Sequence, residues 1–145
     1  MKLPDYVTVD EVKRVCSELG IRDWTSLAKP EVSAEEAQVI LDEVNVTGMN
    51  IGLEGFRQGL QVELEHGTQY EDANVSNNHP ILTGMIVVAH LKETLDYYQR
   101  LDVAEAEGDL LKAVLSKDFA KIEAKYKKLV EAQGALSKAV AEQLR

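Results

Sequence analysis

The chain has 145 residues, of which 45% are hydrophobic and 28% are charged. This composition is ordinary for a globular protein, and the length fits a single domain over 1–145, because two cores would leave each about 70 residues. Sixteen basic residues against 25 acidic ones give a formal net charge of −9. An acidic surface repels phosphate backbones and anionic lipid, so we expect no nucleic-acid partner and no membrane partner.

The cysteine content and the lack of long apolar segments both favour a cytoplasmic protein. Cys16 is the single cysteine, which excludes an internal disulfide and a cysteine-based zinc site. Residues 1–5 carry no signal-peptide core, and the longest unbroken apolar run is 85–89. We therefore expect a protein that stays in the reducing cytoplasm.

Two helices are predicted in the N-terminal region, 1–50. The segment Thr8-Val9-Asp10-Glu11 has the form of a capping box, which predicts a helix over 10–20. The segment Ser33-Ala34-Glu35-Glu36 repeats this form and predicts a second helix, with apolar residues at helical spacing up to Val44.

The region 51–104 is predicted to form a helical hairpin that carries the informative motifs. A third helix is expected over 51–66, ended by Gly67, and a fourth over 81–101. Glycines at three positions lower the helix propensity of the third helix by roughly 1 kcal/mol each, which indicates a closely packed neighbouring helix. These residues are Gly52, Gly55 and Gly59.

The C-terminal region, 105–145, is predicted to be one long helix that starts near Gly108. Its apolar residues recur in steps of mostly three and four, and Gly134 is the expected position of a kink. No segment shows strand-like alternation as strong as this helical spacing of apolar residues. The predicted fold class is therefore all-α, a helical bundle of about five helices with a long C-terminal helix.

Four ionisable residues on the third and fourth helices form the candidate site. Glu63 and His66 lie three residues apart on the apolar side of one helix, and His90 and Glu93 repeat the pair in reverse order on the next. In an antiparallel hairpin, the register that places Glu63 opposite Glu93 also places His66 opposite His90. Two carboxylates and two imidazoles would then lie within about one helical turn, or 5.4 Å.

This arrangement predicts a metal site with Glu63, His66, His90 and Glu93 as ligands. Pairs of the form Glu-x-x-His on inward faces bind the metals of di-iron and di-manganese bundles, and two His with two Glu suit iron, manganese or zinc. Tyr97, one turn beyond Glu93, would be a hydrogen-bond donor or a redox-active neighbour. No residue is singled out as catalytic, and the substrate of such an enzyme is left open.

A second interpretation needs no metal. The same His and Glu pairs would pin the hairpin through hydrogen bonds, and the protein would be a non-catalytic interaction or scaffold module. Three other residues have structural interpretations: His79 would position the start of the fourth helix, Glu65 would face solvent, and Cys16 would be a small buried hydrophobe.

The length of the predicted C-terminal helix suggests self-association. A helix over 109–144 would be roughly 54 Å long, which exceeds the diameter of a compact domain of this size. Either it folds back near Gly134, or its apolar stripe pairs with another copy. Exposed stripes of this length usually mark an interface, so we expect a homodimer.

Several short motifs, in this order, resemble a small bacterial domain-of-unknown-function family in which an ELEHG helix precedes an AHLxE–DYY helix. The residues concerned are Glu63-Leu64-Glu65-His66-Gly67, Asn74-Val75, Pro80, Thr83-Gly84, Ala89-His90-Leu91-Lys92-Glu93 and Asp96-Tyr97-Tyr98. The resemblance covers 56–101, with a weaker echo over 7–20. The chain differs from the family at His79, usually acidic, and at Met85, usually Lys. The resemblance implies no established activity.

Overall fold

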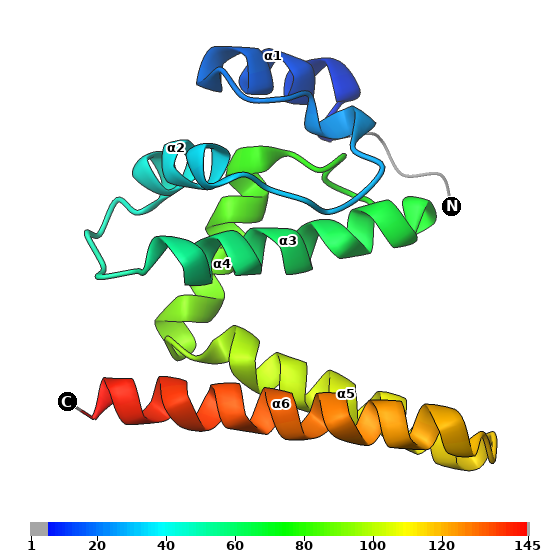
Figure 1. Ribbon diagram of the computed structural model, residues 1–145. Coiled ribbons are helices and arrows are strands. Elements are labelled where there is room, and N and C mark those ends of the chain that lie inside the picture. The colour runs from blue at the N-terminus through cyan, green and yellow to red at the C-terminus, as the bar shows by residue number, and fades with distance from the viewer. Residues whose placement is uncertain (1–5, 145) are drawn as a thin grey trace. The chain divides into compact units, whose positions relative to one another are not determined.

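The computed structural model describes residues 6–144, so the expectation about residues 1–5 lies outside the described part of the chain. The described residues form six α-helices and two short 3-10 helices, without a strand, and the all-α prediction is confirmed. In chain order (Figure 1) the elements are α1 (Val9–Leu19), η1 (Trp24–Ser26), α2 (Ala34–Val44), α3 (Leu53–Gln69), η2 (Glu71–Ala73), α4 (Pro80–Glu93), α5 (Tyr97–Leu115) and α6 (Phe119–Gln143).

The chain divides into two compact units, the first ending at Lys92 and the second beginning at Glu93. The first unit has a closed apolar core, whose members come from α1 to α4 and from the connector at η1. Its completely buried side chains, with 0% exposure, are Val12, Trp24, Ala37, Ile40, Phe56, Leu60 and Val87.

The first two helices begin and end close to the predicted positions. Thr8 caps α1 by accepting a hydrogen bond from the backbone N–H of Glu11, at 3.2 Å, and Gly20 ends it with a left-handed φ of 67°. The capping box of α1 is only half formed, because the side chain of Glu11 binds Arg14, at 2.6 Å. In α2 the predicted capping box of Ser33 and Glu36 is complete in both directions.

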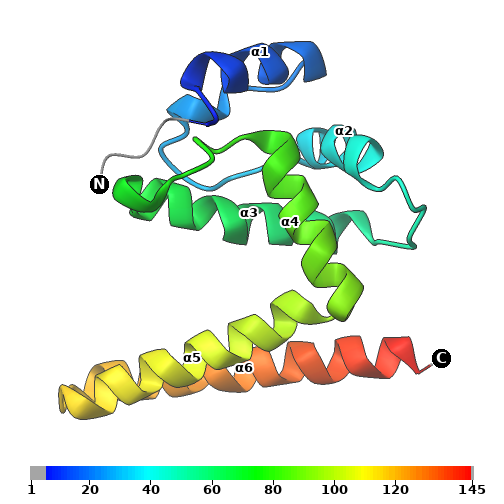
Figure 2. The same cartoon turned by 180° about the vertical axis from the view of Figure 1, so that it is seen from behind.

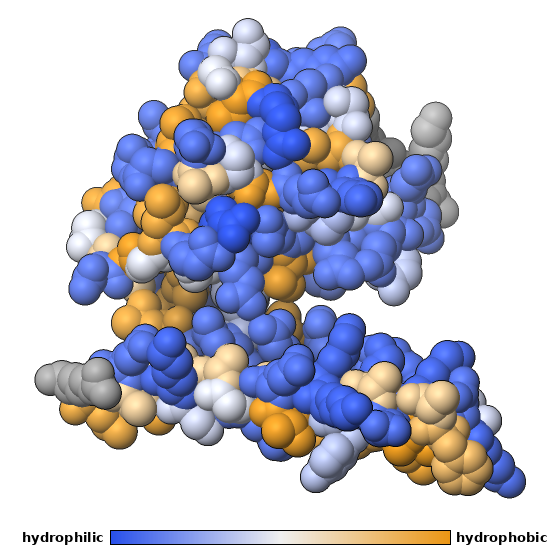
Figure 3. Space-filling view, in the orientation of Figure 1, coloured by the Kyte–Doolittle hydropathy of each residue, from blue (hydrophilic) through white to orange (hydrophobic). Residues whose placement is uncertain are grey.

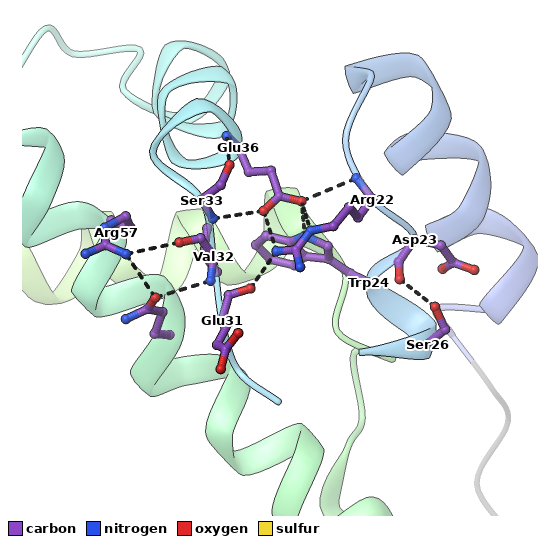
Figure 4. Close-up of polar contacts among 10 residues, drawn as sticks. Arg22, Asp23, Trp24, Ser26, Glu31, Val32, Ser33, Glu36 and Arg57 are labelled. Carbon is purple, nitrogen blue, oxygen red and sulfur yellow. Dashed lines mark hydrogen bonds and ion pairs between the residues drawn. The ribbon is translucent and has the colours of Figure 1, made fainter. Parts of the chain in front are cut away.

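A buried carboxylate connects α2 with the connector before it (Figure 4). Glu36 is 5% exposed and accepts hydrogen bonds from Arg22 Nη2 at 2.6 Å, Ser33 N at 3.0 Å and Trp24 Nε1 at 3.4 Å. Burial alone would raise the pKa of Glu36, but the hydrogen bonds from Arg22 and Ser33 outweigh it and lower the pKa. Glu36 therefore stays ionised and holds the start of α2 against Trp24.

The two helices of the predicted hairpin, α3 and α4, cross instead of lying antiparallel along their lengths (Figures 1 and 2). The reason is that α4 also packs against α2. A Cβ atom on Gly84 would lie 2.6 Å from Ile40 Cγ2 and 3.2 Å from Val44 Cγ1, so only glycine permits this approach. The antiparallel register expected from the sequence is therefore wrong.

The second unit is an antiparallel pair of helices, α5 and α6, as both views show. The predicted fourth helix, 81–101, is interrupted between Glu93 and Tyr97. The predicted C-terminal helix is also interrupted, because α5 runs through Gly108 and ends at Leu115, whereas α6 runs through Gly134 without a break.

A polar residue explains each interruption. Asp96, 1% exposed, binds Arg100 Nη2 at 2.8 Å at the start of α5. Asp118 caps α6 by accepting a hydrogen bond from the N–H of Lys121 at 3.1 Å, after Lys117 turns the chain with a φ of 55°. None of the helices in the described range, 6–144, is both long and apolar enough to cross a membrane.

Candidate functional site

The crossing of α3 and α4 brings two of the four predicted ligands together. Glu63 Oε1 lies 3.6 Å from His90 Nε2, and their side chains are 15% and 28% exposed. Glu63 therefore lies beside His90, whereas the expected antiparallel register placed it opposite Glu93. The contact brings a carboxylate of α3 and an imidazole of α4 together in a partly buried position.

The other two predicted ligands lie elsewhere. His66 is exposed near the end of α3, and Glu93 is the exposed last residue of α4 and belongs to the second unit. Tyr97 is in the second unit too, where its ring packs edge to face on Tyr98 with centroids 5.2 Å apart. Within residues 6–144 no three His, Cys, Asp or Glu side chains are grouped closely enough to hold a metal ion.

The surroundings of His79, Glu65 and Cys16 fit the structural roles that the sequence predicts for them. The Nδ1 atom of His79 accepts a hydrogen bond from Leu82 N at 3.4 Å, so His79 caps the first turn of α4, and burial lowers its pKa. Glu65 is exposed. Cys16 is 2% exposed, and burial raises the pKa of its thiol, which therefore stays protonated.

The loop between α3 and α4 is organised by asparagines: Asn74, which belongs to the motifs of the family resemblance, and Asn77 and Asn78, which had no part in the predictions from the sequence. Asn74 Nδ2 donates to Gly67 O at 3.3 Å, while Asn74 Oδ1 accepts from Asn78 N at 3.2 Å. Asn77 and Asn78 both have left-handed backbones, with φ of 48° and 60°. Asparagine tolerates this conformation better than most residues, so the adjacent pair Asn77-Asn78 was the signal in the sequence that could have predicted this turn.

Gly67 has a different role from the predicted one. It was expected to end the third helix, but α3 continues to Gln69. A Cβ atom on Gly67 would lie 2.0 Å from Asn78 Oδ1 and 3.0 Å from Asn74 Cγ, so the missing side chain makes room for the asparagines. Gly52 and Gly55, expected to face a close neighbour, have open space around them.

A polar pocket of about 290 Å³ opens beside this loop. It lies entirely within the first unit, between the end of α3, the asparagine loop and the connector after Trp24. We refer to it as the asparagine pocket. It is lined by Thr25, Leu27, Gly67, Thr68, Glu71, Asn74, Asn77 and Asn78.

The second unit exposes a set of apolar side chains. Phe119, Tyr126 and Val130 of α6 are 83%, 59% and 51% exposed, and at 100° per residue they fall within an arc of about 40°. Leu111 and Val114 of α5 are exposed as well, at 59% and 48%. We call these five residues the apolar row. Figure 3 shows apolar surface on the hairpin near its turn.

These features define a small all-α protein with a closed N-terminal unit and a C-terminal helical hairpin. The model of the family described as "Protein of unknown function (DUF5661)" matches residues 12–107. Because the match covers more than half of the chain, the chain belongs to this family, and the predicted resemblance to a domain of unknown function is confirmed. No curated protein and no solved structure gives a significant match.

Proposed function

We propose that this chain is a non-catalytic helical interaction protein that forms a homodimer through its second unit. The apolar row carries the proposal, because five large apolar side chains exposed on a two-helix unit favour burial against a partner. In this function the Glu63–His90 contact is structural and fixes α4 against α3.

The hairpin buries few apolar residues of its own. Within the described part of the second unit, the buried hydrophobic side chains are Tyr98, Ala113 and Leu129. An antiparallel pair of helices is half of a four-helix bundle, and two such pairs bury their apolar faces against each other. A second hairpin therefore supplies the surface that the apolar row lacks.

The distribution of charge favours a second copy of the same chain as the partner. The helix α5 has four acidic and two basic residues, a net charge of −2, whereas α6 has three acidic and five basic residues, a net charge of +2. Placing α6 of one copy against α5 of the other pairs opposite charges. Residues 1–92 hold seven basic and 15 acidic residues, a net charge of −8, so pairing through the first unit would bring like charges together.

Light scattering on the full chain at micromolar concentration tests this proposal. We expect a mass of twice the 16.1 kDa of one chain. The variant Tyr126→Glu should be monomeric, because it places a charge inside the interface, whereas Ala124→Glu adds the same charge on another face of α6 and should remain dimeric. A monomeric wild-type chain, or dissociation of both variants alike, would refute the dimer.

The contact between Glu63 and His90 supports a second candidate, a divalent transition metal such as iron, manganese or zinc. A carboxylate and an imidazole at 3.6 Å are two ligand types that these metals accept. Metal content of the purified protein, compared with the double variant Glu63→Gln with His90→Gln, tests it. The candidate requires bound metal that the variant loses, while the interaction protein should keep its dimer in both forms.

We also place the protein in a reducing compartment, most simply the cytoplasm. Cys16 is a buried free thiol, which is typical of proteins that are not oxidised after synthesis. Fractionation of cells that express the tagged chain tests this location, and recovery from an oxidising compartment would contradict it.

A further inference from the structure

We propose that the asparagine pocket binds a neutral ligand that carries several hydroxyl groups, such as a single sugar unit. The pocket belongs to the first unit and is separate from both the Glu63–His90 contact and the apolar row. Binding there is therefore independent of the proposed dimer and of the metal candidate. What the pocket can bind depends on the polar groups that its lining residues leave available.

The three lining asparagines offer both donors and acceptors. One N–H of each amide donates to a backbone carbonyl: Asn74 Nδ2 to Gly67 O at 3.3 Å, Asn77 Nδ2 to Val7 O at 2.5 Å, and Asn78 Nδ2 to Trp24 O at 3.4 Å. A side-chain amide has two N–H groups and two lone pairs on its oxygen. Each asparagine therefore keeps a second N–H and an oxygen acceptor, while its first hydrogen bond holds the amide against the backbone.

The other polar side chains of the lining add acceptors. Thr25 Oγ1 donates to Asp23 Oδ1 at 2.6 Å, and Thr68 Oγ1 donates to Glu65 O at 3.1 Å. Each hydroxyl has one hydrogen and two lone pairs, so each oxygen is left as an acceptor. Glu71 adds a carboxylate, and none of the eight lining residues, all within the described part of the chain, is basic.

This lining disfavours anions, cations and apolar ligands. A phosphate or carboxylate would lie near Glu71, in a unit with a net charge of −8, without a basic side chain to pair with. A metal ion or an ammonium group accepts no hydrogen bond, so it would leave the amide N–H groups without a partner. An apolar ligand would leave nearly the whole lining unpaired, since Leu27 is its one large apolar side chain.

Adjacent hydroxyl groups match the donors and acceptors that remain. Each hydroxyl donates one hydrogen bond and accepts others, so it pairs with an amide N–H and an oxygen acceptor at the same time, and the Glu71 carboxylate accepts from two hydroxyls. A peptide also carries donors and acceptors, but its one N–H per residue is few for a lining so rich in acceptors. The volume of about 290 Å³ is small for a ligand pocket and fits one sugar unit. Because no ion pair contributes, we expect a dissociation constant on the order of 10⁻³ M.

The lining asparagines offer their own reporter for a test, because each side-chain NH₂ group gives separate signals in the nuclear magnetic resonance spectrum of the isotope-labelled, full-length protein. The probes are glucose, galactose, mannose and N-acetylglucosamine, each added up to tens of millimolar. With at least one of these sugars, we expect saturable shifts of the NH₂ signals of Asn74, Asn77 and Asn78 and of the backbone N–H signal of Thr68. N-acetylglycine methylamide, which represents a peptide without side chains, should bind more weakly than that sugar.

Two variants and one control decide the outcome. Asn77→Gly removes one amide while keeping the left-handed backbone, and should weaken sugar binding by about three- to tenfold with an unchanged circular dichroism spectrum. Glu71→Gln keeps the shape of the side chain but removes its charge, and should weaken binding by about threefold or more. Glu65→Gln, an exposed carboxylate of α3 outside the lining, should bind as wild type. Absence of shifts with all four sugars, tighter binding of the peptide probe, or equal sugar binding by all variants would overturn the proposal.

Discussion

The two units of this chain use their apolar residues in opposite ways. The first unit has an apolar core of its own around Trp24 and Phe56, both 0% exposed, and a network around Glu36 fixes the start of α2. In the second unit large side chains such as Phe119 are exposed, and α5 and α6 carry opposite net charges. The comparison shows that amphipathic helices need not share one core, since the first unit buries apolar side chains in a core of its own, while the second leaves large apolar side chains exposed on the surface that we propose as a dimer interface.

Truncation of one large aromatic residue in each unit should show most strongly the contrast between the buried core of the first unit and the exposed apolar side chains of the second. Trp24→Ala removes a completely buried side chain and should lower the free energy of unfolding by about 3 to 5 kcal/mol. Phe119→Ala, at 83% exposure, should change the free energy of unfolding of the monomer by less than about 0.5 kcal/mol, yet weaken the dimer. Urea denaturation at low protein concentration and light scattering measure the two effects. A large loss of monomer stability in Phe119→Ala would contradict the comparison.

The next largest change in stability is expected from the buried carboxylate of the first unit, Glu36. Glu36→Gln leaves the hydrogen bonds of Arg22 and Ser33 weakened and should cost about 2 kcal/mol. The pKa of Glu36 is lowered in the fold, so its contribution is present above its pKa in the unfolded chain and is lost as the pH falls through its pKa in the fold. The stability of Glu36→Gln should therefore fall less steeply in acid than that of the wild type. Glu43→Gln, exposed on the same helix, is the control and should keep the wild-type slope.

Two glycine substitutions should change stability in opposite directions. Gly84→Ala places a Cβ atom 2.6 Å from Ile40 and should destabilise the first unit by about 1 to 3 kcal/mol. Gly55→Ala, in open space on α3, should stabilise it by about 0.5 kcal/mol through helix propensity. Thermal unfolding of both variants measures the difference. If both were destabilised equally, the close approach of α4 to α2 would be wrong.

The parts of this fold that depend on local signals were predictable from the sequence. Thr8 and Ser33 mark helix starts because their side chains bond to backbone groups three residues away, and His79 before Pro80 is a similarly local pattern. The break between α5 and α6 was missed, although Asp118 is a typical N-cap residue, because the apolar stripe continues across the turn. A stripe shows which face is apolar, and the same pattern suits one long helix or two antiparallel ones.

The candidate site was harder to predict because it depends on how helices cross. The sequence places Glu63 and His90 on two helices but does not fix their register, and the contact of Gly84 with α2 turns α4 away from the antiparallel arrangement. The asparagine pocket depends on Gly67 and on residues distant along the chain, such as Thr25. Contacts of this kind arise from tertiary packing, and no local periodicity encodes them.

The smallest expected effect is a pH dependence that belongs to the first unit alone. Burial lowers the pKa of His79 below its usual value, although the nearby Glu11 partly opposes this shift, so the folded unit holds the imidazole neutral. Protonation then favours the unfolded chain, whose histidines titrate near pH 6.5, and stability should fall as the pH decreases through that range. His79→Asn keeps a capping acceptor for α4 but does not titrate, so its urea midpoint should change less between pH 7.5 and 5.5 than that of the wild type. His66→Asn, at an exposed position, should keep the wild-type slope. If the urea midpoint changed equally with pH in the wild type and in His79→Asn, the buried imidazole would contribute nothing to the pH dependence of the first unit.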